Sequence, residues 1–200
     1  MENKKRKDGD IPSFSKRYAF LIIALLTIVL LNHVFFKFFY PTRYKWIVIH
    51  HTSSGYGNLA SIRNFHYQRH GWLDAGYHLI LSNGSTNIPT GHLEATNRYR
   101  LSSYSMASRN PKYNLRGIHL CIVGNYEDSP PSESIKSSLV SAIILLQKKY
   151  RIPDEHILLH RDIGQTLCPG KHITKEHILF WKSVHRKFSD EIQSQQRSVI

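Results

Sequence analysis

The sequence predicts an α/β fold in which a mixed central β-sheet is flanked by about three helices and preceded by one N-terminal transmembrane helix. Three observations support this prediction. Short apolar runs alternate with segments of helical periodicity over most of the chain. An almost unbroken apolar run follows a basic segment near the N-terminus. Two of the short apolar runs end in histidine, which places polar side chains at the ends of predicted strands.

The first 40 residues predict a membrane anchor. Residues 1–17 are polar and basic, and we expect them in the cytoplasm because basic residues flank a span on that side. Residues 18–40 contain an apolar run of about the 20 residues that cross a bilayer. A cleaved signal peptide fits less well, since the run ends in aromatic residues without a small-residue cleavage site. A buried core helix is the other alternative, but the basic flank and the missing polar face disfavour it. We therefore expect a single-pass protein of the cytoplasmic (inner) membrane with the remaining chain on the periplasmic or extracellular side.

Residues 41–188 are expected to form one domain. Trp46–His51 is an unbroken apolar run ending in two histidines, which is typical of a buried central strand. Asn58–His70 repeats apolar residues at the spacing of one helix face. Tyr77–Leu81 is the next predicted strand, and the dipeptide at residues 83–84, Asn-Gly, is a hairpin turn signal.

The second half of this domain continues the alternation. Gly117–Val123 is a clearly apolar strand, and Ser132–Tyr150 is an amphipathic helix preceded by two prolines. Ile157–His160 predicts a short strand and Thr174–Lys187 a last helix. Residues 189–200 are a polar tail that we expect to fray.

Two histidines and one cysteine suggest a metal centre. His50 and His160 each end a predicted strand, and Cys168 lies eight residues after His160 at a Pro-Gly turn. Two imidazoles and a thiolate form the ligand set of a zinc site with one open position, which a hydrolytic zinc needs for its water. The alternative is that His50 is a hydrogen-bonded strand residue and Cys168 a small buried one. Cys121 lies within an apolar strand, and we expect a free core thiol there rather than a disulfide.

Three stretches carry a family resemblance: residues 46–52 (WIVIHHT), 71–80 (GWLDAGYHLI) and 158–170 (LLHRDIGQTLCPG). In this order they resemble the zinc-dependent N-acetylmuramoyl-L-alanine amidases of the type 2 family, which includes amidase-type phage lysozymes and peptidoglycan recognition proteins. The resemblance extends from about Trp46 to about Trp181. It implies Zn²⁺ as the cofactor, with His50, His160 and Cys168 as its ligands.

The resemblance also implies roles for other residues. Tyr77 falls where the family has a catalytic tyrosine, and Thr166 falls where the phage enzymes carry a lysine and recognition proteins that retain activity often carry a threonine. For Thr166 the alternative is a turn hydroxyl that bonds the local backbone. For Tyr77 it is an aromatic packed at the start of a strand. His51, Arg109 and Asn114 are expected to contact substrate, His51 without binding metal.

The sequence departs from the family in three places. Arg109 stands where many members have a histidine, and His119 stands where a small residue is usual, as a strand residue that we expect to face outward. The loop between Gly91 and Arg109 is some ten residues longer than in the compact phage enzymes.

These features predict hydrolysis of the amide bond between N-acetylmuramic acid and L-alanine in peptidoglycan. The alternative is a module that binds peptidoglycan without cutting it. A phage-type lysis protein released from its anchor is a third possibility, disfavoured because the apolar run is too hydrophobic to leave a bilayer easily. We expect a monomer whose partners are peptidoglycan or muropeptides and, through the anchor, the membrane.

The excess of 27 basic over 14 acidic residues fits attraction to polyanions such as the cell wall or anionic lipids. The basic residues are scattered and no nucleic-acid-binding motif accompanies them, so we expect no nucleic acid partner.

Overall fold

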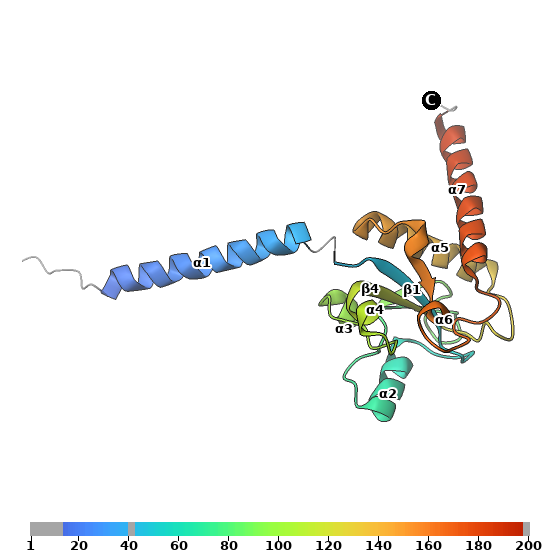
Figure 1. Ribbon diagram of the computed structural model, residues 1–200. Helices are drawn as coiled ribbons and strands as arrows, with labels where there is room; N and C mark the ends of the chain where they lie inside the picture. Colours follow the sequence, from blue (N-terminus) through green and yellow to red (C-terminus); the bar gives the residue numbers. More distant parts are fainter. Residues whose placement is uncertain (1–13, 40–42, 198–200) are drawn as a thin grey trace, which may run out of the picture. The chain divides into compact units, whose positions relative to one another are not determined.

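The computed structural model describes residues 14–39 and 43–197. Contacts divide the chain into two compact units, Met1–Tyr40 and Pro41–Ile200. The described part of the first unit is a single helix, α1 (Phe14–Phe39). All other described elements belong to the second unit (Figure 1).

The prediction of a membrane anchor is corrected by the structure. Within the described ranges 14–39 and 43–197, no helix combines the length and the apolar character that crossing a membrane requires. This finding overturns both the transmembrane helix expected at residues 18–40 and the single-pass inner-membrane location. The expected mixed α/β sheet with flanking helices is present.

The second unit is built around a five-stranded sheet in the order β3-β2-β4-β1-β5. Its strands are β1 (Trp46–His51), β2 (Leu79–Leu81), β3 (Leu93–Ala95), β4 (Gly117–Ile122) and β5 (Ile157–Leu159). The pairs β1–β4, β1–β5 and β2–β4 are parallel, and β2–β3 is antiparallel. The sheet is therefore mixed, and β1 lies between the two other strands that contribute to the site described below.

The register of the parallel strands brings their carboxyl ends together. His50 in β1 pairs with Cys121 in β4, and Ile49 pairs with Leu159, the last residue of β5. His160 follows β5 directly. Because ligands in open α/β sheets bind at the carboxyl ends of the strands, this edge is where a site is expected.

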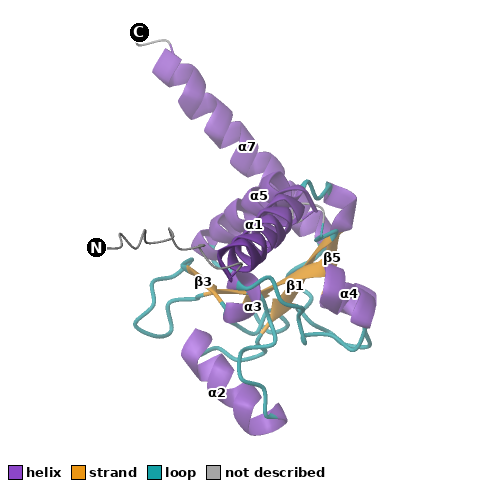
Figure 2. Cartoon of the chain, turned by 90° about the vertical axis from the view of Figure 1, so that its left-hand side faces the viewer, coloured by secondary structure: helices purple, strands orange, loops and turns teal. Residues whose placement is uncertain are grey.

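Three long helices flank the sheet. They are α2 (Leu59–His70), α5 (Glu133–Tyr150) and α7 (Lys175–Arg197). Figures 1 and 2 show α2 on one face of the sheet and α5 with α7 on the other. The ammonium group of Lys182 in α7 is buried and donates to Gln147 in α5 and to Asp154. These two bonds join α7 to α5 and to the segment that follows α5. α7 continues to Arg197, past the end expected at Lys187.

Four short helical segments complete the unit. They are α3 (Asn97–Arg100), α4 (Pro111–Arg116), the 3₁₀ segment η2 (Asp154–His156) and α6 (His160–Ile163). None of them, nor β3, was expected from the sequence, because three to six residues are too few to show an apolar period. β3 and α3 lie in the long loop after Gly91, which is therefore partly ordered as secondary structure.

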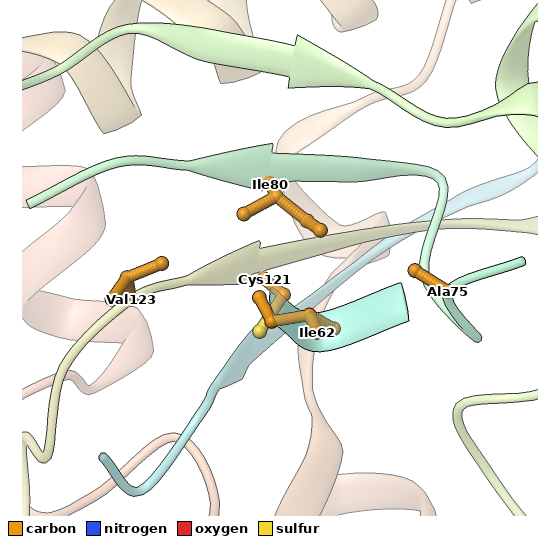
Figure 3. Packing of buried hydrophobic residues seen from close by; sticks show 5 residues of the cluster. All are labelled: Ile62, Ala75, Ile80, Cys121 and Val123. Carbon is orange, nitrogen blue, oxygen red and sulfur yellow. The ribbon is translucent and has the colours of Figure 1, made fainter. Parts of the chain in front are cut away.

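The face of the sheet beneath α2 has a small apolar cluster. Ile62 of α2 packs with Ile80 of β2, with Cys121 of β4 and with two further buried residues, Ala75 and Val123 (Figure 3). Tyr77 is half-buried against this cluster. Cys121 is a free, fully buried thiol. The cluster thus packs α2 against this face of the sheet.

Asp74 anchors the segment between α2 and β2. Its carboxylate accepts a hydrogen bond from Arg63 Nε at 2.8 Å and another from the Arg98 backbone N–H at 3.2 Å. Burial alone would raise the pKa of Asp74, but these bonds and one from the Ala75 backbone outweigh it, so the pKa lies below its ordinary value. The ionised carboxylate is therefore the form that ties α2 to α3.

We expect Asp74→Asn to lower the free energy of unfolding at pH 7 by about 1–2 kcal/mol, because bonds to a charged group are lost. A carboxyl with a lowered folded-state pKa contributes stability that is full above its unfolded pKa of about 3.9 and is lost as pH falls through the folded pKa. The variant should therefore lose less stability than the wild type when pH falls below about 4. Urea unfolding at pH 7 and in the acid range measures both effects. Asp190→Asn, at an exposed position, is the matched control, and equal behaviour of the two variants would contradict the assignment.

Candidate metal centre

The structure brings His50, His160 and Cys168 together. One potential ligand atom from each residue lies within 4.8 Å of the others. His50 Nδ1 is 3.9 Å from Cys168 Sγ, and the two imidazole ring centres are 4.4 Å apart. A tetrahedral zinc with bonds of about 2.3 Å to sulfur and 2.0–2.1 Å to nitrogen separates such atoms by about 3.5 Å. The donor set and its spacing therefore fit a zinc ion with little movement.

The three side chains reach this point from three separate elements. His50 is near the end of β1 and 1% exposed, whereas His160 begins α6 and is half-buried. Cys168 lies in the turn before α7. The Arg161 side chain holds that turn, since Nη2 donates to the carbonyls of Gly170 and Ile173 at 2.6 Å each. The Arg161 backbone N–H also donates to the Cys168 carbonyl at 2.9 Å.

Gly170 permits the close approach of this turn to the loop after β4. Its φ is +98°, and a Cβ placed on it would lie 2.2 Å from the Tyr126 carbonyl carbon. A side chain therefore fits neither the backbone conformation nor the space. The sulfur position depends on this contact because Gly170 is two residues from Cys168.

The histidine after His50 has a different role. His51 Nδ1 accepts the Tyr126 backbone N–H at 3.2 Å, and His51 Nε2 lies 2.7 Å from Ser53 Oγ. With both ring nitrogens bonded within the protein, His51 is not placed to bind metal. Its backbone N–H donates to Cys168 Sγ at 3.3 Å, so it contributes to the site by fixing the sulfur.

His119 is the residue that the sequence interpretation misjudged. Instead of facing outward, it is fully buried, and its Nδ1 lies 2.9 Å from His50 Nε2. His119 Nε2 lies 3.0 Å from the Tyr113 carbonyl oxygen. Burial, reinforced by His78, lowers the pKa of His119 to about 3, and burial together with His119 and His160 holds the pKa of His50 well below 6.5. Both rings are therefore neutral at physiological pH. β4 is buried on both faces, so its apolar pattern carried no signal that a polar residue within it lies inside.

The thiol of Cys168 is protonated in the metal-free protein. Burial raises its pKa to about 11, although the His51 N–H and the nearby Arg161 act in the opposite direction. Burial also lowers the pKa of His160. At neutral pH the two imidazoles are ready to bind a cation, whereas the thiol must first release its proton.

Tyr77 lies beside the three candidate ligands. Its ring centre is 5.2 Å from that of His50, and burial, with the neighbouring thiols Cys121 and Cys168, raises the pKa of its hydroxyl well above 10. The phenol is therefore neutral and able to donate a proton in a hydrogen bond. Tyr77 also lines a pocket of about 330 Å³. The other lining residues are Thr52, Ser54, Tyr56, Ser61, Ile62, Phe65 and His66.

The remaining predicted residues are placed less directly. Thr166 is exposed, and its Oγ1 accepts the Cys168 N–H at 3.1 Å, which is the local turn bond considered as its alternative role. Asn114 is bonded to Ser108 through both side-chain atoms and so orders the loop before α4. Arg109 is exposed on that same loop. Of these three side chains, that of Thr166 contacts a candidate ligand residue directly.

The sequence profile of the family described as N-acetylmuramoyl-L-alanine amidase matches residues 40–171. The chain belongs to this family. The recognition made from the three sequence motifs is thus confirmed.

Individual relatives agree with this assignment. Peptidoglycan-recognition protein SC1a of Drosophila melanogaster is 25% identical over 141 residues, covering 66% of this chain and 71% of the relative. Peptidoglycan recognition protein 1 of Bos indicus is 24% identical over 144 residues, covering 68% and 70%. The solved structure of the N-acetylmuramoyl-L-alanine amidase LysC from Clostridium intestinale superposes with a TM-score of 0.56 at 26% identity, covering 70% of this chain and 85% of that one. Bumblebee PGRP-SA, at 17% identity and a TM-score of 0.55 with 67% and 80% covered, shares the fold.

We expect Gly170→Ala to displace the Cys168 turn, because a Cβ would overlap the Tyr126 backbone and φ is positive. The strain should lower the free energy of unfolding by about 1–3 kcal/mol and weaken metal binding. Thermal unfolding and zinc titration of the metal-free protein measure the two effects. Gly55→Ala is the control, since nothing lies within 4 Å of a Cβ at that position. The same behaviour in both variants would show that the turn tolerates a side chain.

Proposed function

We propose that this protein is a zinc-dependent amidase that hydrolyses the bond between N-acetylmuramic acid and L-alanine in peptidoglycan. Membership of the N-acetylmuramoyl-L-alanine amidase family supports the class of bond. The observation that carries the proposal is the convergence of two neutral imidazoles and one thiol at the carboxyl ends of β1 and β5. A protein that only bound the wall would not need this donor set.

In this proposal His50 Nδ1, one ring nitrogen of His160 and Cys168 Sγ hold the zinc ion. A bound zinc supplies a Lewis acid and lowers the pKa of a water molecule to about 7. The His51 N–H keeps the sulfur in place, and Arg161 holds the turn that carries it. These groups prepare the ligand positions before a cation arrives.

Tyr77 is the group proposed to act on the substrate. Hydrolysis adds one water to the amide, so the carbonyl carbon gains a hydroxyl group, the C–N bond breaks and the leaving amine gains a proton. Negative charge develops on the carbonyl oxygen during this step, and a neutral phenol can donate a hydrogen bond to it. The raised pKa keeps the Tyr77 proton available for that bond.

The pocket beside Tyr77 is proposed to receive the substrate. Tyr56 and Phe65 in its wall are largely exposed, and aromatic faces of this kind can pack against a sugar ring or an apolar part of the stem peptide. Arg109, Asn114 and His51 remain proposed substrate contacts, and Thr166 a proposed second donor. For Arg109 the supporting observation is its exposed guanidinium, which could pair with a carboxylate of the peptide.

The full chain incubated with purified peptidoglycan should release stem peptides that begin at L-alanine, identified by mass spectrometry. A metal chelator should abolish this release, and so should Cys168→Ala, because the thiolate ligand is lost. Ser183→Ala, at an exposed position in α7, is the control for a nonspecific effect of substitution. Peptidoglycan that binds the protein yet stays intact would contradict the proposal and identify a recognition module.

We expect Tyr77→Phe to lower the rate of hydrolysis by about 10²–10³, the usual cost of removing one oxyanion donor. Zinc affinity should stay unchanged, because the Tyr77 hydroxyl is not among the ligand atoms. Steady-state kinetics on a soluble muropeptide, together with zinc titration, separate the two effects. Tyr67→Phe removes an exposed hydroxyl on α2 outside this pocket and should keep nearly full activity. A comparable loss in both variants would argue against a specific role for Tyr77.

A further inference from the structure

The ring of His119 connects a candidate metal ligand to the protein backbone. His119 Nδ1 lies 2.9 Å from His50 Nε2, and His119 Nε2 lies 3.0 Å from the carbonyl oxygen of Tyr113 in α4. The residue is fully buried, so water does not compete for either contact. Both ring nitrogens of His119 therefore have one defined partner each.

The direction of these hydrogen bonds follows from the partner at the backbone end. A carbonyl oxygen can only accept, so His119 Nε2 carries the hydrogen. In a neutral imidazole the other nitrogen is then an acceptor, and His50 Nε2 must donate to His119 Nδ1. His50 is left with its lone pair on Nδ1, the atom that lies 3.9 Å from Cys168 Sγ.

His119 is itself fixed from both sides. Its backbone N–H donates to His78 Nδ1 at 3.0 Å, and His78 Nε2 lies 3.0 Å from the Ser103 carbonyl oxygen. Gly117 leaves room for the backbone contact, since a Cβ there would lie 2.6 Å from the Tyr113 oxygen and 3.3 Å from His119 Nε2. The acceptor presented to His50 is therefore held rigidly.

We propose that His119 is a positioning residue that sets the tautomer and the ring orientation of His50 for metal binding. The inference rests on the proposed zinc centre and adds to it a residue that lies outside the ligand group. Partners that hold the second nitrogen of a metal-binding histidine typically contribute 10–100-fold to metal affinity. The role needs a hydrogen-bond acceptor at the position of Nδ1 and not merely a bulky side chain.

Two substitutions of similar polarity distinguish the need for an acceptor at the position of Nδ1 from the need for a bulky side chain. In His119→Asn a side-chain oxygen can occupy the place of Nδ1 and accept from His50. In His119→Gln the amide reaches the place of Nε2 and keeps the contact with the Tyr113 carbonyl, but no acceptor faces His50. Zinc affinity of the metal-free full chain is measured by competition with a chromophoric chelator, after circular dichroism has shown that each variant is folded.

We expect His119→Gln to bind zinc 10–100-fold more weakly than the wild type, and His119→Asn to bind close to the wild-type value. Equal affinity of His119→Gln and wild type would overturn the inference. An equal loss in both variants would also overturn it, because packing of the ring would then be the only contribution. A wild-type chain that binds no zinc would instead overturn the proposed metal centre, and this inference with it.

A second measurement needs no variant. Long-range ¹H–¹⁵N correlation spectra of the metal-free wild type, labelled on histidine, report which nitrogen of His50 carries the hydrogen. The inference requires the Nε2–H tautomer of His50 before any metal is added. A substantial population of the Nδ1–H tautomer would overturn it, whatever the activity of the enzyme. The spectrum of His119→Gln should show this preference lost.

Discussion

The parallel pairing of β1 with β4 on one side and with β5 on the other is the constraint on which the site depends. It places His50 beside Cys121 and brings His160, at the end of β5, to the same edge of the sheet. Side chains alternate between the two faces of a strand, so a shift of one residue would turn His50 to the opposite face. The ladder of backbone hydrogen bonds is therefore what positions the imidazoles, and the turn held by Arg161 needs only to supply the sulfur.

Burial of several polar side chains gives this region a single arrangement. An unpaired polar group in a protein interior costs about 1–3 kcal/mol, so each buried histidine must find partners. His78 Nε2 lies at the Ser103 carbonyl and its Nδ1 accepts the His119 backbone N–H, while the His119 ring links the Tyr113 carbonyl to His50. The Tyr113 carbonyl only accepts, and it therefore fixes the direction of the bond between His50 and His119. The loop that follows β3 and the helix α4 thus act on the site without touching it.

The sequence was sufficient for the family, the mixed sheet and the three long helices, because long apolar periods and motif spacing are strong signals. It was not sufficient for β3, α3 and α4, whose few residues depend on contacts with the rest of the fold. The inward position of His119 was missed because a strand buried on both faces shows no alternation of polarity. The expected anchor, which rested on the length of the apolar run and on its basic flank, is overturned within the described residues. Which ring nitrogen of His50 carries the hydrogen could be inferred only from atomic contacts.

The protonated thiol of Cys168 has a consequence for how the centre would be filled. With a pKa near 11 the sulfur carries hydrogen at neutral pH, while both imidazoles are already free of it. A cation that binds to all three ligand residues must displace the proton of the Cys168 thiol. The apparent affinity for the metal would then fall about tenfold for each unit by which pH decreases. The acidity of the surroundings would in this way act as a competitor for the same sulfur.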